Sequence, residues 1–157
     1  MPHSEVPLHD LPRIDGHEVT VAAAPEAAWA AVLETLRGTF AAPAARSATR
    51  LLGCDPTTTS GWGRPGPGAT VPGFRVVTVE APRLLVVAGR HRFSRYGMVV
   101  RLEPADGGTR VQLESRAAFP GPHGALYRLA VVGTGGHVVA VRRLLAGVRR
   151  AAERRPA

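Results

Sequence analysis

The C-terminal stretch Gly124–Arg155 constrains the fold most, because it has the pattern of one long amphipathic helix. Its apolar residues recur at intervals of three and four, the spacing that places side chains on one helical face. That stripe consists of Leu126, Leu129, Ala130, Gly133, His137, Ala140, Val141, Leu144, Leu145 and Val148. Gly133, Gly135 and Gly136 interrupt the pattern, and each costs about 1 kcal/mol relative to Ala in a helix. We therefore expect a kink near these glycines, or the close approach of another element.

The preceding region, residues 74–119, alternates apolar and polar side chains and is divided by turn sequences. This pattern predicts an antiparallel meander without crossover helices. The expected strands are Phe74–Glu80, Leu84–Phe93, Tyr96–Glu103 and Thr109–Phe119, with an earlier strand at His17–Ala23. A two-residue turn at Ser94-Arg95 pairs Phe93 with Tyr96, and a slip of one residue would bury arginines at a high cost. The inward side chains are then Leu85, Val87, Gly89, His91, Phe93, Tyr96, Met98, Val100, Leu102, Val111, Leu113, Ser115, Ala117 and Phe119.

Two shorter helices are predicted between the first and second strands. Pro25 and Glu26 suit the first turn of a helix, which Gly38 then ends. A weaker helix is expected within Pro43–Gly53, with Ala44, Ala48, Leu51 and Leu52 facing inward. The stretch that follows, Cys54–Gly73, is rich in Gly and Pro. We expect it to be a long mobile loop that gates a cavity and displays Trp62.

These elements predict an α+β fold. A sheet with one buried face must be covered, and the C-terminal helix is the only element long enough to cover it. The expected architecture is an antiparallel sheet that grips this helix, with two short helices between the first and second strands. The length indicates a single domain over 1–157, with a core at about 17–153 and an N-terminal arm at 1–16.

Composition excludes several classes of protein. No apolar run reaches the roughly 18 residues of a membrane span, and the N-terminal residues show no export signal. Cys54 is the single cysteine, so an internal disulfide is excluded and a cytoplasmic location is expected. All 20 basic residues are Arg, and residues 75–157 hold 15 of them against 5 acidic residues. This charge could attract an acidic partner, but without a strip of basic and aromatic residues nucleic-acid binding is not expected.

The order of elements, with the pattern V-x-V-x-A-x-P-E-x-x-W in Val19–Trp29, resembles the START-related (SRPBCC) helix-grip superfamily. That group includes polyketide cyclases and dehydrases, lipid-transfer domains and plant ligand binders similar to the birch-pollen allergen. Gly73–Val77, Gly89–Tyr96 and Phe119–His137 are similar to segments of uncharacterised bacterial members. The resemblance covers about residues 17–153. It implies a curved sheet gripping the long helix over an apolar cavity, but no shared set of catalytic residues.

Small inward residues indicate where such a cavity would lie. Gly89, Ser115, Ala117 and Gly133 imply either close packing of backbones or empty space. Polar groups interspersed among them favour a pocket, since small-molecule sites are mostly apolar with a few polar groups. The candidate ligand-binding residues are Trp62, Gly89, His91, Tyr96, Met98, Ser115, Ala117, Phe119, Tyr127, Gly133 and His137.

His91 and His137 are the candidate acid–base residues, because imidazole titrates near neutral pH. Each could instead be a hydrogen-bonded structural residue. For His137 the expected partners are a ligand, Ser115 or His91. Two histidines without an inward carboxylate fall short of the usual three metal ligands, so no metal and no cofactor are expected.

Three functions remain open from the sequence. The first is binding of a small apolar or aromatic molecule between the sheet and the C-terminal helix by a monomer or homodimer. The second is an enzyme of the polyketide cyclase or dehydratase type that uses the same cavity. The third is an Arg-rich adaptor for an acidic partner.

Overall fold

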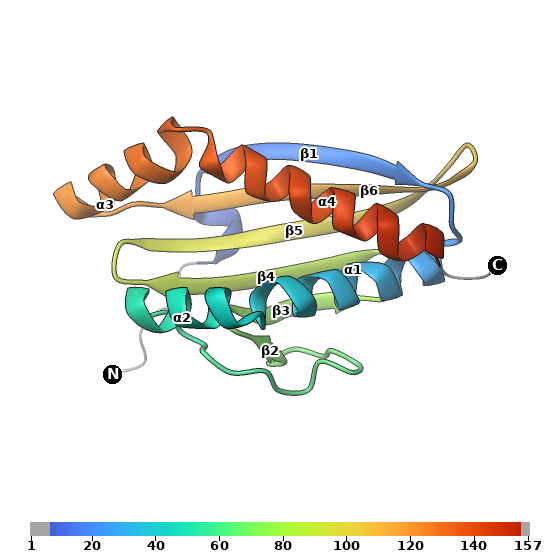
Figure 1. Ribbon diagram of the computed structural model, residues 1–157, viewed down its shortest axis with the longest axis horizontal. Helices are drawn as coiled ribbons and strands as arrows, with labels where there is room; N and C mark the ends of the chain where they lie inside the picture. The colour runs from blue at the N-terminus through green and yellow to red at the C-terminus, as the bar shows by residue number, and fades with distance from the viewer. Residues whose placement is uncertain (1–6, 155–157) are drawn as a thin grey trace.

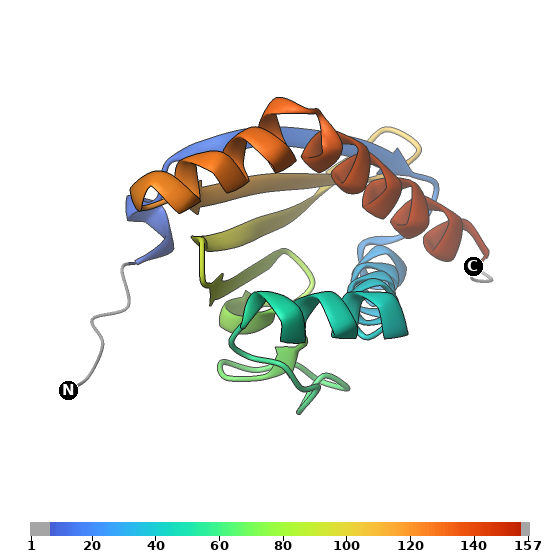
Figure 2. The same cartoon turned by 60° about the vertical axis from the view of Figure 1, so that its left-hand side comes forward.

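A six-stranded antiparallel sheet forms the centre of the computed structural model, which describes residues 7–154. The strands lie in the order β1-β6-β5-β4-β3-β2. Their bounds are β1 (Arg13–Val21), β2 (Thr70–Val71), β3 (Phe74–Glu80), β4 (Leu84–His91), β5 (Ser94–Ala105) and β6 (Gly108–Ala118). Figure 2 shows the sheet curving toward the helices, which lie on its concave face. The predicted α+β fold is confirmed.

Two helices separate β1 from β2, as predicted: α1 (Pro25–Phe40) and α2 (Pro43–Leu52). Each has proline in its first turn, where the missing N–H does no harm, and Gly53 ends α2 with a φ of 69°. The prediction that Gly38 ends α1 is wrong. The helix continues to Phe40 and stops before Pro43, which disfavours helical backbone in the residue it follows.

The C-terminal helix is broken, as its glycines predicted. It consists of α3 (Gly121–Arg128), a π-helical turn (Leu129–Gly133) and α4 (Gly136–Arg154). Gly135 adopts a φ of 78°, and the two helical parts are bent by 53°. Arg155, where the predicted helix ends, lies outside the described residues. No single helix within residues 7–154 is long and apolar enough to cross a membrane.

The break changes which side chains face the sheet. In α4 the predicted stripe is buried at Val141, Leu144, Leu145 and Val148, each at 7% exposure or less. Ala140, predicted on the same stripe, is exposed, and His137 is half-buried. Before the break the prediction is wrong: Leu126 and Leu129 are 67% and 65% exposed, because α3 projects at the end of the sheet (Figure 1). Three of the four residues of α2 that were predicted inward are exposed: Leu51, at 78%, and Ala44 and Ala48. Only Leu52 is half-buried.

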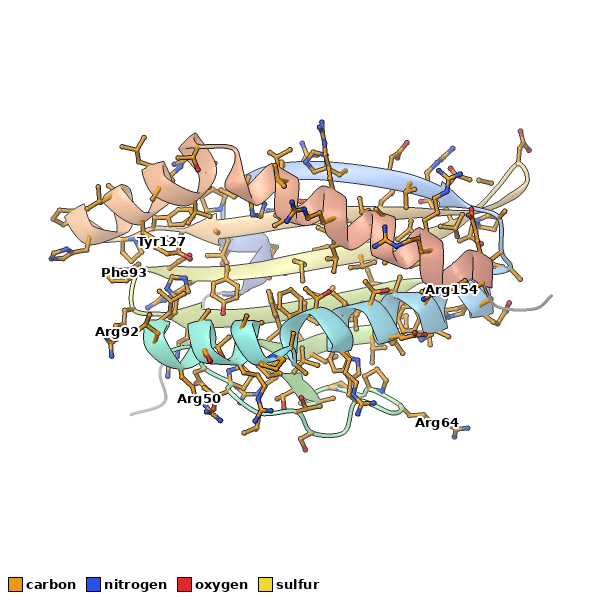
Figure 3. The ribbon with its side chains drawn as sticks, viewed as in Figure 1. Arg50, Arg64, Arg92, Phe93, Tyr127 and Arg154 are labelled. Atoms are coloured by element: carbon orange, nitrogen blue, oxygen red, sulfur yellow. The ribbon has the colours of Figure 1, made fainter. Side chains whose placement is uncertain are left out.

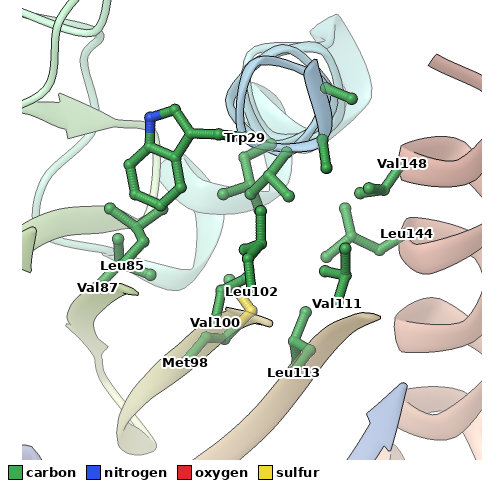
Figure 4. Close-up of a cluster of buried hydrophobic side chains, with 14 of the residues drawn as sticks. Trp29, Leu85, Val87, Met98, Val100, Leu102, Val111, Leu113, Leu144 and Val148 are labelled. Carbon is green, nitrogen blue, oxygen red and sulfur yellow. The ribbon is translucent and has the colours of Figure 1, made fainter. Parts of the chain in front are cut away.

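The hydrophobic core fills the space between the sheet, α1 and α4 (Figure 4). The predicted inward residues Leu85, Val87, Met98, Val100, Leu102, Val111 and Leu113 all belong to it. The register of the β4–β5 hairpin differs from the prediction, because the turn falls at Arg92-Phe93 and pairs His91 with Ser94. The predicted pairing of Phe93 with Tyr96 would have placed Met98 opposite His91, four positions further along β5 than Ser94. An even shift leaves the side chains that remain in the strands on their predicted face, while Phe93, predicted to end the strand, lies in the turn.

The first strand begins earlier than predicted, at Arg13 instead of His17. Its register against β6 shifts between Arg13 and Asp15, which is a β-bulge with Ile14 as the extra residue. This start of β1 places Asp15 beside Ser115 of β6.

Candidate functional site

A cavity of about 310 Å³ lies at the end of the sheet near α2 and α3. Its floor is the concave face of β5 and β6, with Met98, Ser115 and Ala117. Its other walls come from α2, from the C-terminal helices and from Cys54 and Gly73 of the long loop. The volume is at the lower end of the roughly 300–1,000 Å³ typical of small-molecule pockets.

The structure brings most of the sequence-predicted site residues to this cavity. Those that line it are His91, Tyr96, Met98, Ser115, Ala117, Phe119, Tyr127 and His137. Trp62, Gly89 and Gly133 are not among its walls.

Trp62 lies in the core instead of at the cavity. Its side chain is 6% exposed, and its indole N–H donates to the carbonyl of Leu33 in α1 at 2.9 Å. The loop that carries it is tied to the sheet by backbone bonds, including Gly68 N–H to the Val76 carbonyl and an exchange between Asp55 and Arg90. The loop contributes a cavity wall through Cys54, Pro72 and Gly73, and Trp62 anchors it to α1.

The two predicted glycines have other roles. A Cβ at Gly89 would overlap the Gly73 carbonyl and would lie 2.9 Å from the Tyr96 ring, so Gly89 is small because of close packing. Gly133 lies exposed in the π-helical turn. Small inward residues therefore marked both close packing, at Gly89, and the cavity, at Ser115 and Ala117.

Aromatic rings form a continuous wall along the cavity. Phe40 contacts Phe74 at 4.7 Å between ring centroids, and Phe74 contacts Tyr96 at 5.2 Å. The wall continues from Tyr96 to His91 at 5.4 Å and from His91 to Tyr127 at 4.8 Å. Phe93 and Phe119 flank Tyr127, and Figure 3 shows Phe93 and Tyr127 side by side.

All four Phe and both Tyr of the chain thus gather at this one site, while both Trp residues are buried elsewhere. The sequence analysis missed Phe40 and Phe74 as site residues. The rings come from segments far apart in the chain, so no local pattern joins them.

Burial shapes the polar chemistry of this wall. The Tyr96 hydroxyl donates to the Gly73 carbonyl at 2.8 Å, and burial raises the pKa of Tyr96 and of the Cys54 thiol that hydrogen-bonds with it. Burial lowers the pKa of His91. The Nδ1 atom of His91 accepts from the Phe93 N–H at 3.1 Å, so its Nε2 carries the ring proton in the neutral form.

His137 is held by an aspartate that the sequence analysis placed in the arm. Its Nε2 lies 3.3 Å from Oδ1 of Asp15, and Nε2 of His17 lies 3.1 Å from Oδ2 of the same carboxylate. The expected protein partners, Ser115 and His91, are therefore wrong, and so is the expectation that no inward carboxylate exists. Continuing the alternation of Val21 and Val19 back through His17 would have placed Asp15 on this face.

Ser115 presents the one buried side-chain polar atom without a hydrogen-bond partner among residues 7–154. It is 4% exposed and lies in the cavity floor. A buried hydroxyl without a partner costs about 1–3 kcal/mol, so a ligand that supplies one would recover that cost. Within residues 7–154, no group of three or more His, Cys, Asp or Glu residues is arranged to hold a metal ion.

Solved structures of low sequence identity share this fold. MLL2253 from Mesorhizobium loti matches with a TM-score of 0.56 at 17% identity, covering 91% of this chain and 98% of that protein. An uncharacterised protein from Rhizobium leguminosarum matches with a TM-score of 0.54 at 14% identity, covering 90% of this chain and 94% of that protein. Ara h 8.0201 matches with a TM-score of 0.54 at 13% identity, covering 88% of this chain and 95% of that protein. No family model and no curated protein matches the chain in sequence. The structural likenesses confirm the helix-grip fold that the resemblance implied.

Proposed function

We propose that the protein binds a small aromatic or apolar molecule that carries a hydrogen-bonding group, within the cavity between the sheet and the C-terminal helices. The supporting observation is that the Ser115 hydroxyl is buried and unpartnered in the floor of a cavity walled by aromatic rings. Aromatic side chains favour planar apolar ligands through stacking and edge contacts. The hydroxyl supplies one directional bond that fixes the ligand's orientation.

Native mass spectrometry of the purified protein tests this function first, because a co-purified ligand would appear as added mass. Titration with the apolar dye ANS provides a second measurement. Ala117→Phe places a large ring in the cavity floor and should reduce dye affinity at least tenfold while the melting temperature stays within a few degrees. Gly63→Ala, at a loop position where a Cβ meets nothing within 4 Å, is the matched control. Unchanged dye binding in Ala117→Phe would contradict the proposal.

The contact between Asp15 and His137 favours a second candidate, an enzyme that removes a proton from a substrate in this cavity. A carboxylate only accepts hydrogen bonds, so the Nε2 atom of His137 carries the proton and Nδ1 is left with the lone pair. Asp15 thereby orients a base whose side chain lines an apolar pocket. His137 is then the catalytic residue and Asp15 the positioning residue.

A nitrobenzisoxazole tests this second candidate without knowledge of the natural substrate. A base removes its ring C–H proton, the N–O bond breaks, and a coloured cyanophenolate forms. His137→Gln should abolish any acceleration above free imidazole, and Asp15→Asn should lower it at least tenfold. His91→Gln is the matched control, because its imidazole lines the same cavity without a carboxylate partner in the described chain. Equal rates in wild type and His137→Gln would exclude His137 as the base.

A further inference from the structure

Three long segments of the chain that reach the cavity end of the molecule contain no acidic side chain. Residues 35–54, 81–102 and 115–152 contain neither Asp nor Glu. They include α2, the β4–β5 turn and the whole of α3 with its π-helical turn. Figure 1 shows these three parts at the same end of the sheet.

Exposed arginines without an acidic partner occupy this end, and the guanidinium of one of them, Arg128, lies over the Phe119 ring at 5.9 Å from its centroid. Arg50 of α2, Arg92 of the β4–β5 turn and Arg128 of α3 are all exposed, and none forms an ion pair within residues 7–154. Arg46 and Arg95 are also exposed and form no ion pair within the described residues. Strand arginines such as Arg90 and Arg110 differ, since each contacts a carboxylate. Figure 3 places Arg50 and Arg92 at the cavity end, and Arg64 and Arg154 at the opposite end.

Large apolar side chains are exposed at the same end. Leu51 of α2, and Leu126 and Leu129 of α3 and the π-helical turn, are 78%, 67% and 65% exposed. Leu126 and Leu129 are three positions apart, so they share one helical face. The described chain exposes only two other large apolar residues, Val77 and Val139, at 50% and 49%. We call Leu51, Leu126, Leu129, Arg50, Arg92 and Arg128 together the basic rim.

We propose that the basic rim docks on an anionic lipid surface. Leucines on two helices at the same end of the molecule can enter the boundary between headgroups and acyl chains, while the arginines lie at the level of the phosphates. The complementary charge is supplied by the surface, because these segments contain no acid of their own. The cavity lies directly behind the rim, walled by Leu52 and Tyr127 of the same helices, so an apolar ligand could move between lipid and cavity with little exposure to water.

Co-sedimentation with two kinds of vesicle tests the proposal. One is phosphatidylcholine alone and the other is phosphatidylcholine mixed with phosphatidylglycerol. Binding is expected only to the anionic vesicles and should weaken as salt is raised. Arg92→Gln and Arg128→Gln should each reduce the affinity about fivefold, the equivalent of about 1 kcal/mol per arginine near an anionic surface. Leu126→Ser with Leu129→Ser should reduce it at least tenfold.

Matched controls come from the opposite end and the outer face. Arg64→Gln removes an exposed arginine away from the rim, and Val77→Ser removes an exposed apolar side chain from β3. Both should leave vesicle binding unchanged. Equal binding to neutral vesicles, or rim variants that bind as wild type, would overturn the proposal. The proposal would also be overturned if the protein bound polyglutamate as tightly as anionic vesicles and the leucine variant did not weaken either interaction. That result would indicate an acidic protein partner. Ala117→Phe should still bind vesicles, which separates this proposal from ligand binding.

Discussion

Replacing Ser115 by Ala should stabilise the protein, which is unusual for a change at a buried site. The Ser115 Oγ is buried without a hydrogen-bond partner in the described chain, and such a group costs about 1–3 kcal/mol. Deleting one atom beside an existing cavity loses few packing contacts. The net effect expected on the free energy of unfolding is a gain of about 1 kcal/mol, or about 2–4 °C in melting temperature for a chain of this size.

Thr109→Val is the matched comparison, because Thr109 is fully buried but its hydroxyl donates to the Ala23 carbonyl at 2.8 Å. That variant keeps the shape, removes the donor and should lose about 1–3 kcal/mol. Urea unfolding measures the free energy of unfolding of both variants, and the changes relative to wild type should have opposite signs. A loss of 1 kcal/mol or more in Ser115→Ala would refute the reasoning, since it would mean that the hydroxyl already has a partner. If the ligand uses this hydroxyl, the same variant should bind it about tenfold more weakly.

Two further predictions concern stability. Gly89→Ala should lose about 3 kcal/mol in the free energy of unfolding or fail to fold, because the added Cβ overlaps the Gly73 carbonyl. Gly38→Ala should gain about 1 kcal/mol, because it lies in a helix at a position where a Cβ meets nothing within 4 Å. Equal stability of the two variants in urea unfolding would contradict this. Burial lowers the pKa of His91, so the unfolded chain, with a value near 6.5, binds that proton more readily. Stability should therefore fall as pH drops below about 6.5, and less steeply in His91→Gln; parallel pH profiles would show that His91 does not contribute.

The alternation of side chains was enough to predict the sheet and its buried face. It placed Met98, Ser115 and Ala117 on the concave surface even though the hairpin turn lies two residues earlier than expected. The face depends only on whether a residue is at an odd or even position, while the pairing depends on where the chain turns. Gly133, Gly135 and Gly136 likewise marked the break in the C-terminal helix, because Gly135 adopts a left-handed conformation that other residues disfavour.

The cavity and its chemistry depended on contacts between distant segments. Residue size alone did not distinguish Gly89, which is small because a carbonyl packs against it, from Ala117, which borders empty space. The partner of His137 lies 122 positions away, at a bulge of β1, and the aromatic wall joins residues from Phe40 to Tyr127. Periodicity in the sequence determines which way a side chain faces, because that is a local property of the backbone. What each side chain meets was decided only by the tertiary structure, through the curvature of the sheet and the 53° bend of the helix over it.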